Sequence, residues 1–359
     1  MERANRRTGR GPIGGRVTST DLKMTARTLV AAGKGILAAD ETVQIATKRL
    51  ETAAILSTPD SRRLYRELFL TTPGISEFIS GVILHDETLR QHSASGRAFA
   101  DLLLRNGILP GIKVDDGTRA LAGSHGEAVT EGLDGLNDRL AEYRELGARF
   151  AKWRAVFVVS GTLPSAACTH ANAHALARYA AMCQEQRLVP IVEPEVLVEG
   201  AHSIDRCEEV TGNVLHAVFE ALHDQRVYLE AMLVRPNMVT AGSEYAMRST
   251  IEDVATSTVR CLRRHVPAAV PGVVFLSGGQ DHLAATSHLN AINRLTTPKP
   301  WTLTFSYGRA LQSEALTEWR GRAGNVKAAQ AAFTHRARCC SAAALGRYTA
   351  AMEREPAAV

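Results

Sequence analysis

The sequence predicts a single α/β domain with the architecture of a (β/α)8 TIM barrel. Eight short apolar runs recur along the chain, and amphipathic helical patterns fill several of the gaps between them. Successive runs start roughly 30–45 residues apart, which is enough for a loop, a helix and a return loop before the next parallel strand. The 359 residues also suffice for one large core.

Each apolar run is interpreted as one strand of the barrel. In chain order the runs cover residues 35–39, 79–84, 110–114, 151–159, 189–192, 228–234, 272–276 and 301–305. Eight runs separated by helical patterns favour a closed barrel over an open doubly wound sheet. The lone Gly33-Lys34-Gly35 is no dinucleotide fingerprint, and the chain contains no P-loop pattern.

Three gaps between the runs show a helical period. Residues 137–150 place Leu140 and Tyr143 on one face, and residues 165–186 and 205–223 repeat the same spacing of apolar side chains. These gaps are therefore predicted to be helices that cover the barrel.

The two ends are expected to lie outside the barrel. Residues 1–18 contain five arginines and no apolar stretch of a secretory signal, so a disordered basic tail is favoured over a transit peptide. The barrel is expected over residues 19–348, with a short tail over residues 349–359. No segment rich in Pro, Gly or Ser divides the chain.

The composition favours a cytoplasmic protein without membrane or nucleic-acid partners. No apolar run approaches the ~20 residues that cross a bilayer. The net charge of +5 is modest, and phosphorylated metabolites satisfy it as easily as nucleic acid does. The six cysteines show no metal-binding spacing, and we expect reduced thiols.

Polar residues at the ends of the predicted strands are the candidate active-site residues, because the loops of a barrel converge there. Lys152 and Arg154 are two residues apart and share one strand face, as do Glu193 and Glu195 on the next run. One such pair alone is typical of a structural salt bridge, but charges at successive strand ends favour a ligand site. Further candidates at strand ends are Asp40, Glu41, Lys113, Asp115, Arg235, Ser277, Ser306 and Arg309.

Two loops are predicted to bind phosphate. Ser277-Gly278-Gly279 offers backbone N–H groups and a hydroxyl, and Gly308-Arg309 offers N–H groups and a guanidinium. The loops follow the seventh and eighth predicted strands, where barrels commonly bind phosphate.

Several longer motifs resemble those of class I fructose-bisphosphate aldolases, which work through a lysine Schiff base. They are Gly-Lys-Gly-Ile-Leu-Ala-Ala-Asp-Glu (33–41), Gly-Ile-Lys-Val-Asp (111–115), Ala-Lys-Trp-Arg (151–154), Pro-Ile-Val-Glu-Pro-Glu (190–195), Phe-Leu-Ser-Gly-Gly-Gln (275–280) and Phe-Ser-Tyr-Gly-Arg-Ala-Leu (305–311). The resemblance extends over roughly residues 22–348.

The resemblance implies roles for four charged residues. Asp40 would orient the C4 hydroxyl of the sugar and assist cleavage of the C3–C4 bond. Glu193 would be the principal acid and base, with Glu195 beside it, and Lys152 would hold substrate oxygens.

The resemblance also implies a phosphorylated ketose as substrate, no cofactor, no catalytic metal, and a homo-oligomer, in many members a tetramer. One phosphate would be bound by Arg49, Lys113 and Arg154. The other would be bound by Ser277, Gly278, Gly308 and Arg309. The loop over residues 42–45 departs from the Ser-Thr-Gly-Ser of the family, which weakens the assignment of Arg49.

Arg235 stands where the family has its Schiff-base lysine, directly before Pro236-Asn237-Met238. The reaction needs a neutral amine to attack the ketone, and the iminium then accepts the electrons of the breaking C–C bond. A guanidinium stays protonated and cannot form this iminium. If the chain is active, Lys152 is the expected substitute nucleophile.

Two functions therefore remain open. One is a lyase that cleaves fructose 1,6-bisphosphate into dihydroxyacetone phosphate and glyceraldehyde 3-phosphate in glycolysis. The other is a catalytically inactive sensor or scaffold that binds sugar phosphates. A metal-dependent aldolase is a third reading, because His170 and His174 have a zinc-binding spacing, but without a third ligand they are interpreted as surface histidines.

Overall fold

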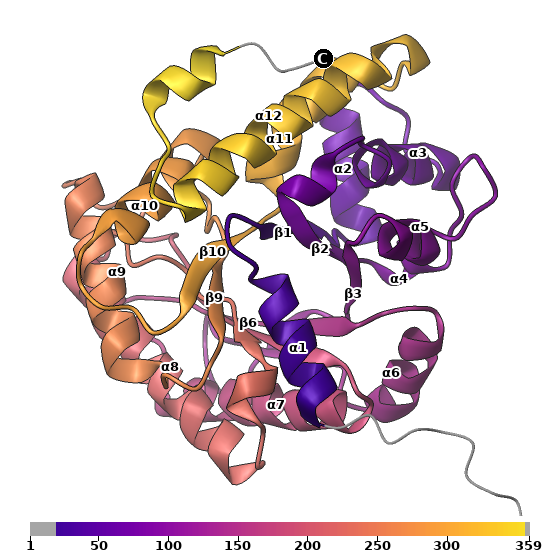
Figure 1. The fold of residues 1–359 in the computed structure, drawn as a ribbon. Coiled ribbons are helices and arrows are strands. Elements are labelled where there is room, and N and C mark those ends of the chain that lie inside the picture. The colour runs from indigo at the N-terminus through magenta and orange to yellow at the C-terminus, as the bar shows by residue number, and fades with distance from the viewer. Residues whose placement is uncertain (1–18, 356–359) are drawn as a thin grey trace, which may run out of the picture.

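The centre of the molecule is a closed barrel of eight parallel strands (Figure 1). The computed structural model describes residues 19–355. The barrel strands are β1 (Gly35–Ala39), β2 (Ile79–Leu84), β3 (Leu109–Lys113), β6 (Phe150–Phe157), β7 (Val189–Val196), β8 (Leu233–Val234), β9 (Gly272–Phe275) and β10 (Thr302–Tyr307). They close in the order β1-β10-β9-β8-β7-β6-β3-β2, with Ile36 of β1 beside Ser306 of β10. The predicted (β/α)8 barrel is confirmed.

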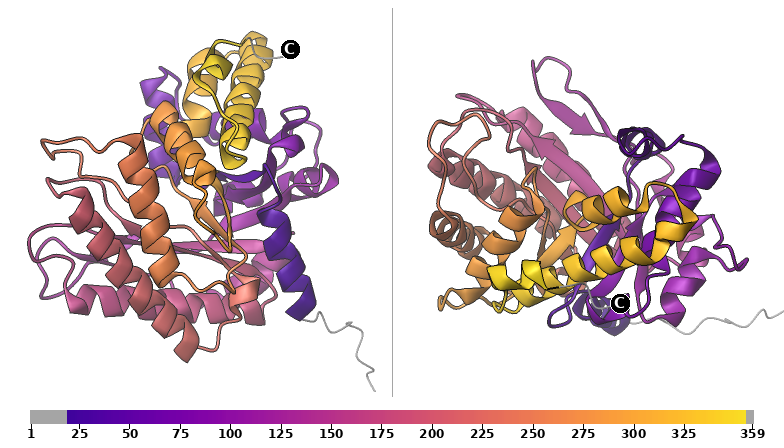
Figure 2. Two further views of the ribbon diagram at one scale, coloured as in Figure 1. Left: turned by 60° about the vertical axis from the view of Figure 1, so that its left-hand side comes forward. Right: turned by 90° about the horizontal axis from the view of Figure 1, so that it is seen from above.

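Helices surround this sheet on its outer side in all views (Figures 1 and 2). They are α2 (Val43–Thr52), α3 (Pro59–Leu70), α4 (Asp86–Leu89), α5 (Phe99–Arg105), α6 (Leu136–Glu145), α7 (Ala166–Glu185), α8 (Ile204–Asp224), α9 (Ile251–His265), α10 (His282–Arg294), α11 (Arg309–Trp319) and α12 (Val326–Ala344), while α1 (Ser19–Leu29) lies at one end of the barrel. A short antiparallel pair, β4 (Thr118–Ala120) and β5 (Ala128–Thr130), lies between β3 and α6.

Alternation along β6 divides the barrel interior into an apolar base and a charged mouth. Phe150 points inward and packs in one apolar cluster with residues of five other strands. Trp153 points outward to Tyr179 of α7, with ring centroids 5.6 Å apart. Because successive side chains of a strand alternate, Lys152 and Arg154 share the inward face of Phe150, two and four residues nearer the carboxyl end.

Helix α1 closes the base of the barrel. Its Leu22, Ala26 and Leu29 belong to the same buried cluster as Phe150 and Ile36. In Figure 1 this helix crosses in front of the barrel strands. The charged mouth is therefore at the opposite end, where the strands end and the loops begin.

The sixth predicted strand is wrong over most of its length. Only Leu233–Val234 pair as β8, whereas Leu229–Ala231 form the 3-10 helix η2. Tyr228 is exposed, and Glu230 makes a 3.9 Å ion pair with Lys23 of α1. The apolar run turns against α1 before it enters the sheet, and composition alone does not distinguish such a turn from a strand.

Two further bounds differ from those expected. Helix α6 ends at Glu145, because Gly147 has a φ of 107° and Phe150 already belongs to β6. Strand β7 runs on to Val196 and includes Pro194. The predicted helices over residues 165–186 and 205–223 correspond to α7 and α8.

Residues 1–18 and 356–359 lie outside the residues that the structure describes. The expected N-terminal tail and the predicted domain limits therefore stay predictions. Within the expected C-terminal tail, Ala350–Arg354 form the 3-10 helix η4. No helix in residues 19–355 is long and apolar enough to cross a membrane.

Gly111 of β3 is required by its close approach to Phe150. A Cβ at this position would lie 2.2 Å from the phenyl ring. Gly111→Ala is therefore expected to lower the free energy of unfolding by ~1–3 kcal/mol, the cost of an overpacked core. Urea unfolding measures the change.

The matched control is Gly324→Ala, where an added Cβ meets nothing within 4 Å. This variant is expected to change the stability by less than about 0.5 kcal/mol. Equal stabilities of the two variants would contradict the close contact at the base of the barrel.

Candidate active site

One cavity of about 240 Å³ at the mouth of the barrel is lined by all twelve predicted site residues. They are Asp40, Arg49, Lys113, Lys152, Arg154, Glu193, Glu195, Arg235, Ser277, Gly278, Gly308 and Arg309. They come from the ends of the barrel strands, the loops that follow them, and the helices α2 and α11. Their individual roles stay predictions.

Lys152 lies between two carboxylates in the wall of this cavity. Its Nζ is 2.7 Å from Oδ2 of Asp40 and 3.2 Å from Oε2 of Glu193, and its side chain is 4% exposed. Burial alone would lower the pKa of Lys152, but the two carboxylates raise it well above the usual lysine value. Burial would likewise raise the pKa of Asp40, yet Lys152 and Arg235 hold it well below its usual range. Both groups are therefore charged at neutral pH.

Arg235 follows β8, and three hydrogen bonds fix its guanidinium. Nε donates to Oγ of Ser306 at 2.9 Å, and Nη2 donates to the carbonyl oxygen of Ser306 at 2.6 Å. Nη1 donates to the carboxylate of Glu193. Glu193 thus lies between Lys152 and Arg235 and has contacts with both cations.

Three of the predicted phosphate-binding cations already pair with carboxylates: Arg154 with Glu195 at 2.5 Å, Lys113 with Asp115 at 2.7 Å, and Arg49 with Glu41. Arg309 is exposed and makes no ion pair with any residue of the described part of the chain. Six cationic and four acidic side chains line the cavity, a net charge of +2 that favours an anionic ligand.

The two predicted phosphate loops follow β9 and β10, and both line the cavity. Gly278 and Gly279 have φ angles of 53° and 79°, which place the turn in the left-handed region that favours glycine. Gly308 precedes Arg309, the first residue of α11, and a Cβ at Gly308 would lie 3.2 Å from the carbonyl oxygen of Ala38. The free N–H groups at the start of α11 suit an anion.

A buried network that holds Arg49 was not predicted. Arg49 donates to Oε1 of Gln312 at 2.7 Å, and the Tyr65 hydroxyl donates to the same oxygen at 2.7 Å. Glu41 lies between Arg49 and the buried Arg66. From the sequence, Glu41 is recognised only as a polar residue at a strand end. No sequence pattern predicts that it lies near Tyr65 of α3 and Gln312 of α11.

His170 and His174 are both exposed on α7. Within residues 19–355 no cysteine, acidic residue or further histidine forms a three-ligand group with them.

The fold and the site together define a (β/α)8-barrel protein with a cationic mouth that carries acid and base groups. The family model for class-I fructose-bisphosphate aldolase matches residues 21–358. The chain therefore belongs to the class-I fructose-bisphosphate aldolase family, a family of glycolytic lyases that act on a phosphorylated sugar. The resemblance seen in the motifs is confirmed.

Relatives of known name align with most of the chain. A protein named fructose-bisphosphate aldolase 4, cytosolic, from Arabidopsis thaliana is 55% identical over 316 residues, which cover 88% of this chain and 80% of the plant protein. A probable fructose-bisphosphate aldolase class 1 from Xanthomonas axonopodis pv. citri is 51% identical over 328 residues, which cover 91% of this chain and 98% of the bacterial protein.

A solved structure has the same fold. It is the fructose-bisphosphate aldolase of Plasmodium falciparum in complex with TRAP and a small-molecule inhibitor. The two chains superpose with a TM-score of 0.91 at 49% sequence identity, and the match covers 92% of this chain and 96% of the other.

Proposed function

We propose that the barrel mouth binds a phosphorylated ketose of the fructose 1,6-bisphosphate type, and that Arg235 limits the Schiff-base step of its cleavage. One observation carries the proposal: the predicted acid, base and phosphate-binding residues surround one cavity whose Schiff-base position is an arginine. Such a site retains recognition of the substrate while it lacks the amine that forms the iminium.

The charges of the cavity support binding of a bisphosphate. Arg309 and the N–H groups that begin α11 suit one phosphate, together with the loop at Ser277. Lys113 and Arg154 suit the other, and a phosphate there would compete with the carboxylates that now pair with them.

The chemistry at Arg235 separates this chain from the reaction of its family. In the proposed complex Glu193 moves protons at the substrate oxygens and Asp40, which is ionised, accepts a hydrogen bond from the C4 hydroxyl. The guanidinium of Arg235, held by Ser306 and Glu193, contributes hydrogen bonds and positive charge but no nucleophilic nitrogen.

Cleavage through Lys152 is the second candidate function, because this lysine lies in the same cavity. Its pKa is raised by Asp40 and Glu193, so the amine is protonated in the empty site. A bound ketose would have to displace at least one of these carboxylates before the nitrogen could attack.

Borohydride trapping tests the two candidates. The protein is incubated with fructose 1,6-bisphosphate or dihydroxyacetone phosphate, reduced, and examined by intact mass and peptide mapping, while calorimetry measures binding. Binding without an adduct supports the first candidate. An adduct on Lys152 or another lysine supports a relocated Schiff base, and the absence of both binding and adduct contradicts the proposed function.

Arg309→Met is expected to weaken binding of fructose 1,6-bisphosphate by about 10- to 100-fold, the loss of one charge-assisted phosphate contact of ~1.5–3 kcal/mol. Arg322→Met, an exposed arginine beyond α11, is the control and should leave the affinity unchanged. Calorimetry on the two purified variants measures the effect. Equal affinities would remove Arg309 from the phosphate site.

We also propose that the chain works in the cytoplasm as a homo-oligomer, by resemblance a tetramer. Two plant relatives are named cytosolic, and all six cysteines are free and buried. Light scattering on the purified full chain tests the assembly, and a monomer mass at micromolar concentration would contradict it. Microscopy of a fluorescent fusion tests the compartment.

A further inference from the structure

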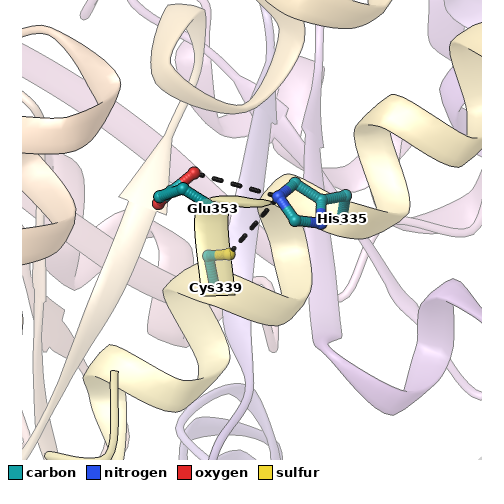
Figure 3. A group of neighbouring side chains, drawn as sticks. All are labelled: His335, Cys339 and Glu353. Atoms are coloured by element: carbon teal, nitrogen blue, oxygen red, sulfur yellow. Dashed lines mark hydrogen bonds and ion pairs between the residues drawn. The ribbon is translucent and has the colours of Figure 1, made fainter. Parts of the chain in front are cut away.

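A second group of chemically reactive side chains lies away from the barrel mouth, where α12 meets η4 (Figure 3). His335 and Cys339 are four residues apart on α12 and therefore lie on the same helix face. Glu353 reaches them from η4. Nε2 of His335 is 3.8 Å from Sγ of Cys339 and 3.8 Å from Oε2 of Glu353.

We propose that His335, Cys339 and Glu353 bind one zinc-type divalent cation, with a water molecule as fourth ligand. Thiolate, imidazole and carboxylate are the side chains that bind zinc. Their three ligand atoms all lie within 4.8 Å of one another, and residues 19–355 contain no second group of this kind. The site is separate from the barrel mouth and plays no part in the proposed sugar chemistry.

Two of the three separations between ligand atoms are close to those of a tetrahedral centre, and the third lies within 4.8 Å. With Zn–S at about 2.3 Å and Zn–N at about 2.0–2.1 Å, neighbouring ligand atoms lie roughly 3.5 Å apart. The observed 3.8 Å separations are a few tenths of an ångström longer, which small side-chain rotations can close. His335 and Glu353 are 10% and 20% exposed, so the ion has a route from solvent.

Neighbouring groups orient the carboxylate as outer-shell partners do in zinc sites. The fully buried Arg336 pairs with both oxygens of Glu353, at 2.5 and 2.9 Å, and the Tyr348 hydroxyl donates to Oε1 at 2.7 Å. Oε2, which accepts the shorter of the two hydrogen bonds from Arg336, also faces Nε2 of His335 and has a second lone pair for an ion.

The charge balance decides how tightly the ion is held. Zinc binds the thiolate form of a cysteine, so binding at Cys339 must release the thiol proton. A dication with one thiolate, one carboxylate and the adjacent Arg336 forms a group of net charge +1. The affinity should therefore rise with pH and be moderate for a site with three protein ligands.

Cobalt and zinc titrations of the chelator-treated full chain test the proposal. The expected result is one Co²⁺ per chain with a thiolate-to-cobalt absorption band, which one equivalent of Zn²⁺ abolishes. Cys339→Ser should remove the band. His335→Gln should weaken cobalt binding by at least on the order of 100-fold, because the loss of a group that only supports a ligand already costs up to about that much. Circular dichroism confirms that each variant is folded.

Cys340→Ser is the matched control. Cys340 is adjacent in sequence and equally buried, but its Sγ faces Thr286 of α10 at 3.7 Å. This variant should keep the band and the affinity. A wild-type chain that binds no cobalt, or a Cys340→Ser variant that loses the band while His335→Gln keeps it, would overturn the proposal. If Cys339→Ser does not fold, His335→Gln decides by itself, because its position is partly exposed.

Discussion

Arg235→Lys is expected to create Schiff-base aldolase activity, with kcat/KM for fructose 1,6-bisphosphate at least about 10³-fold above that of the unaltered chain, or ~4 kcal/mol of transition-state stabilisation. The substitution places an amine on the residue that follows β8, within the cavity that Asp40 and Glu193 also line. It also releases the carboxylate of Glu193 from the guanidinium. A coupled assay for dihydroxyacetone phosphate measures the gain.

Arg235→Gln is the control for this gain. It removes the guanidinium but supplies no nucleophile, so it should not increase cleavage. Borohydride should trap the substrate at position 235 in the lysine variant alone. A folded Arg235→Lys protein that binds the sugar but forms no adduct would show that the cavity is unfit for the family's chemistry for a reason other than this residue.

Lys152→Met is expected to lower the free energy of unfolding at pH 7 by about 3–5 kcal/mol, the cost of breaking a buried ion pair from one side. The change removes the ammonium that lies 2.7 Å from Asp40 and 3.2 Å from Glu193. Asp40, which is 13% exposed, loses this partner, while the buried Glu193 keeps Arg235. Lys48→Met is the control, because Lys48 is exposed on α2 and its loss should cost less than about 0.5 kcal/mol. Urea unfolding measures both.

The loss caused by Lys152→Met should shrink as the pH falls from 7 toward about 3. In the unaltered protein the folded-state pKa of Asp40 lies below its unfolded value of about 3.9, so this carboxylate stabilises the fold above that pH. Without Lys152 its pKa rises, and protonation at acid pH relieves the unpaired charge. The pKa of Lys152 is raised in the folded protein, so its ammonium stabilises the fold at all pH values below its unfolded pKa of about 10.4. A loss that is independent of pH would contradict this pairing.

The barrel was predictable because parallel strands buried on both faces leave continuous apolar runs in the sequence. Seven of the eight runs correspond to strands over most of their length. The sixth run does not, because it begins with the turn against α1 and only its last two residues form β8. The candidate site was predictable for a related reason. Residues such as Lys152 and Glu193 are far apart in sequence, but every strand of a parallel barrel ends at the same mouth.

The interactions within the site were not predictable. The charge of Lys152 depends on its separations from Asp40 and Glu193, which only the closed barrel brings together. The same holds for Gln312 of α11, which receives hydrogen bonds from Arg49 and Tyr65. Pattern and spacing describe one element at a time, whereas these contacts join different elements, and Arg49 and Gln312 are 263 positions apart in the chain.

Because α1 fills the base of the barrel, the mouth has a single entrance. A ligand must leave by the path through which it arrived, and no second molecule can pass it. If Arg235 prevents cleavage, the sugar departs only as the intact molecule, so its residence time equals the reciprocal of its dissociation rate constant. Such a chain would hold phosphorylated ketose as a reservoir, and slow exchange of bound with free sugar would be its kinetic signature.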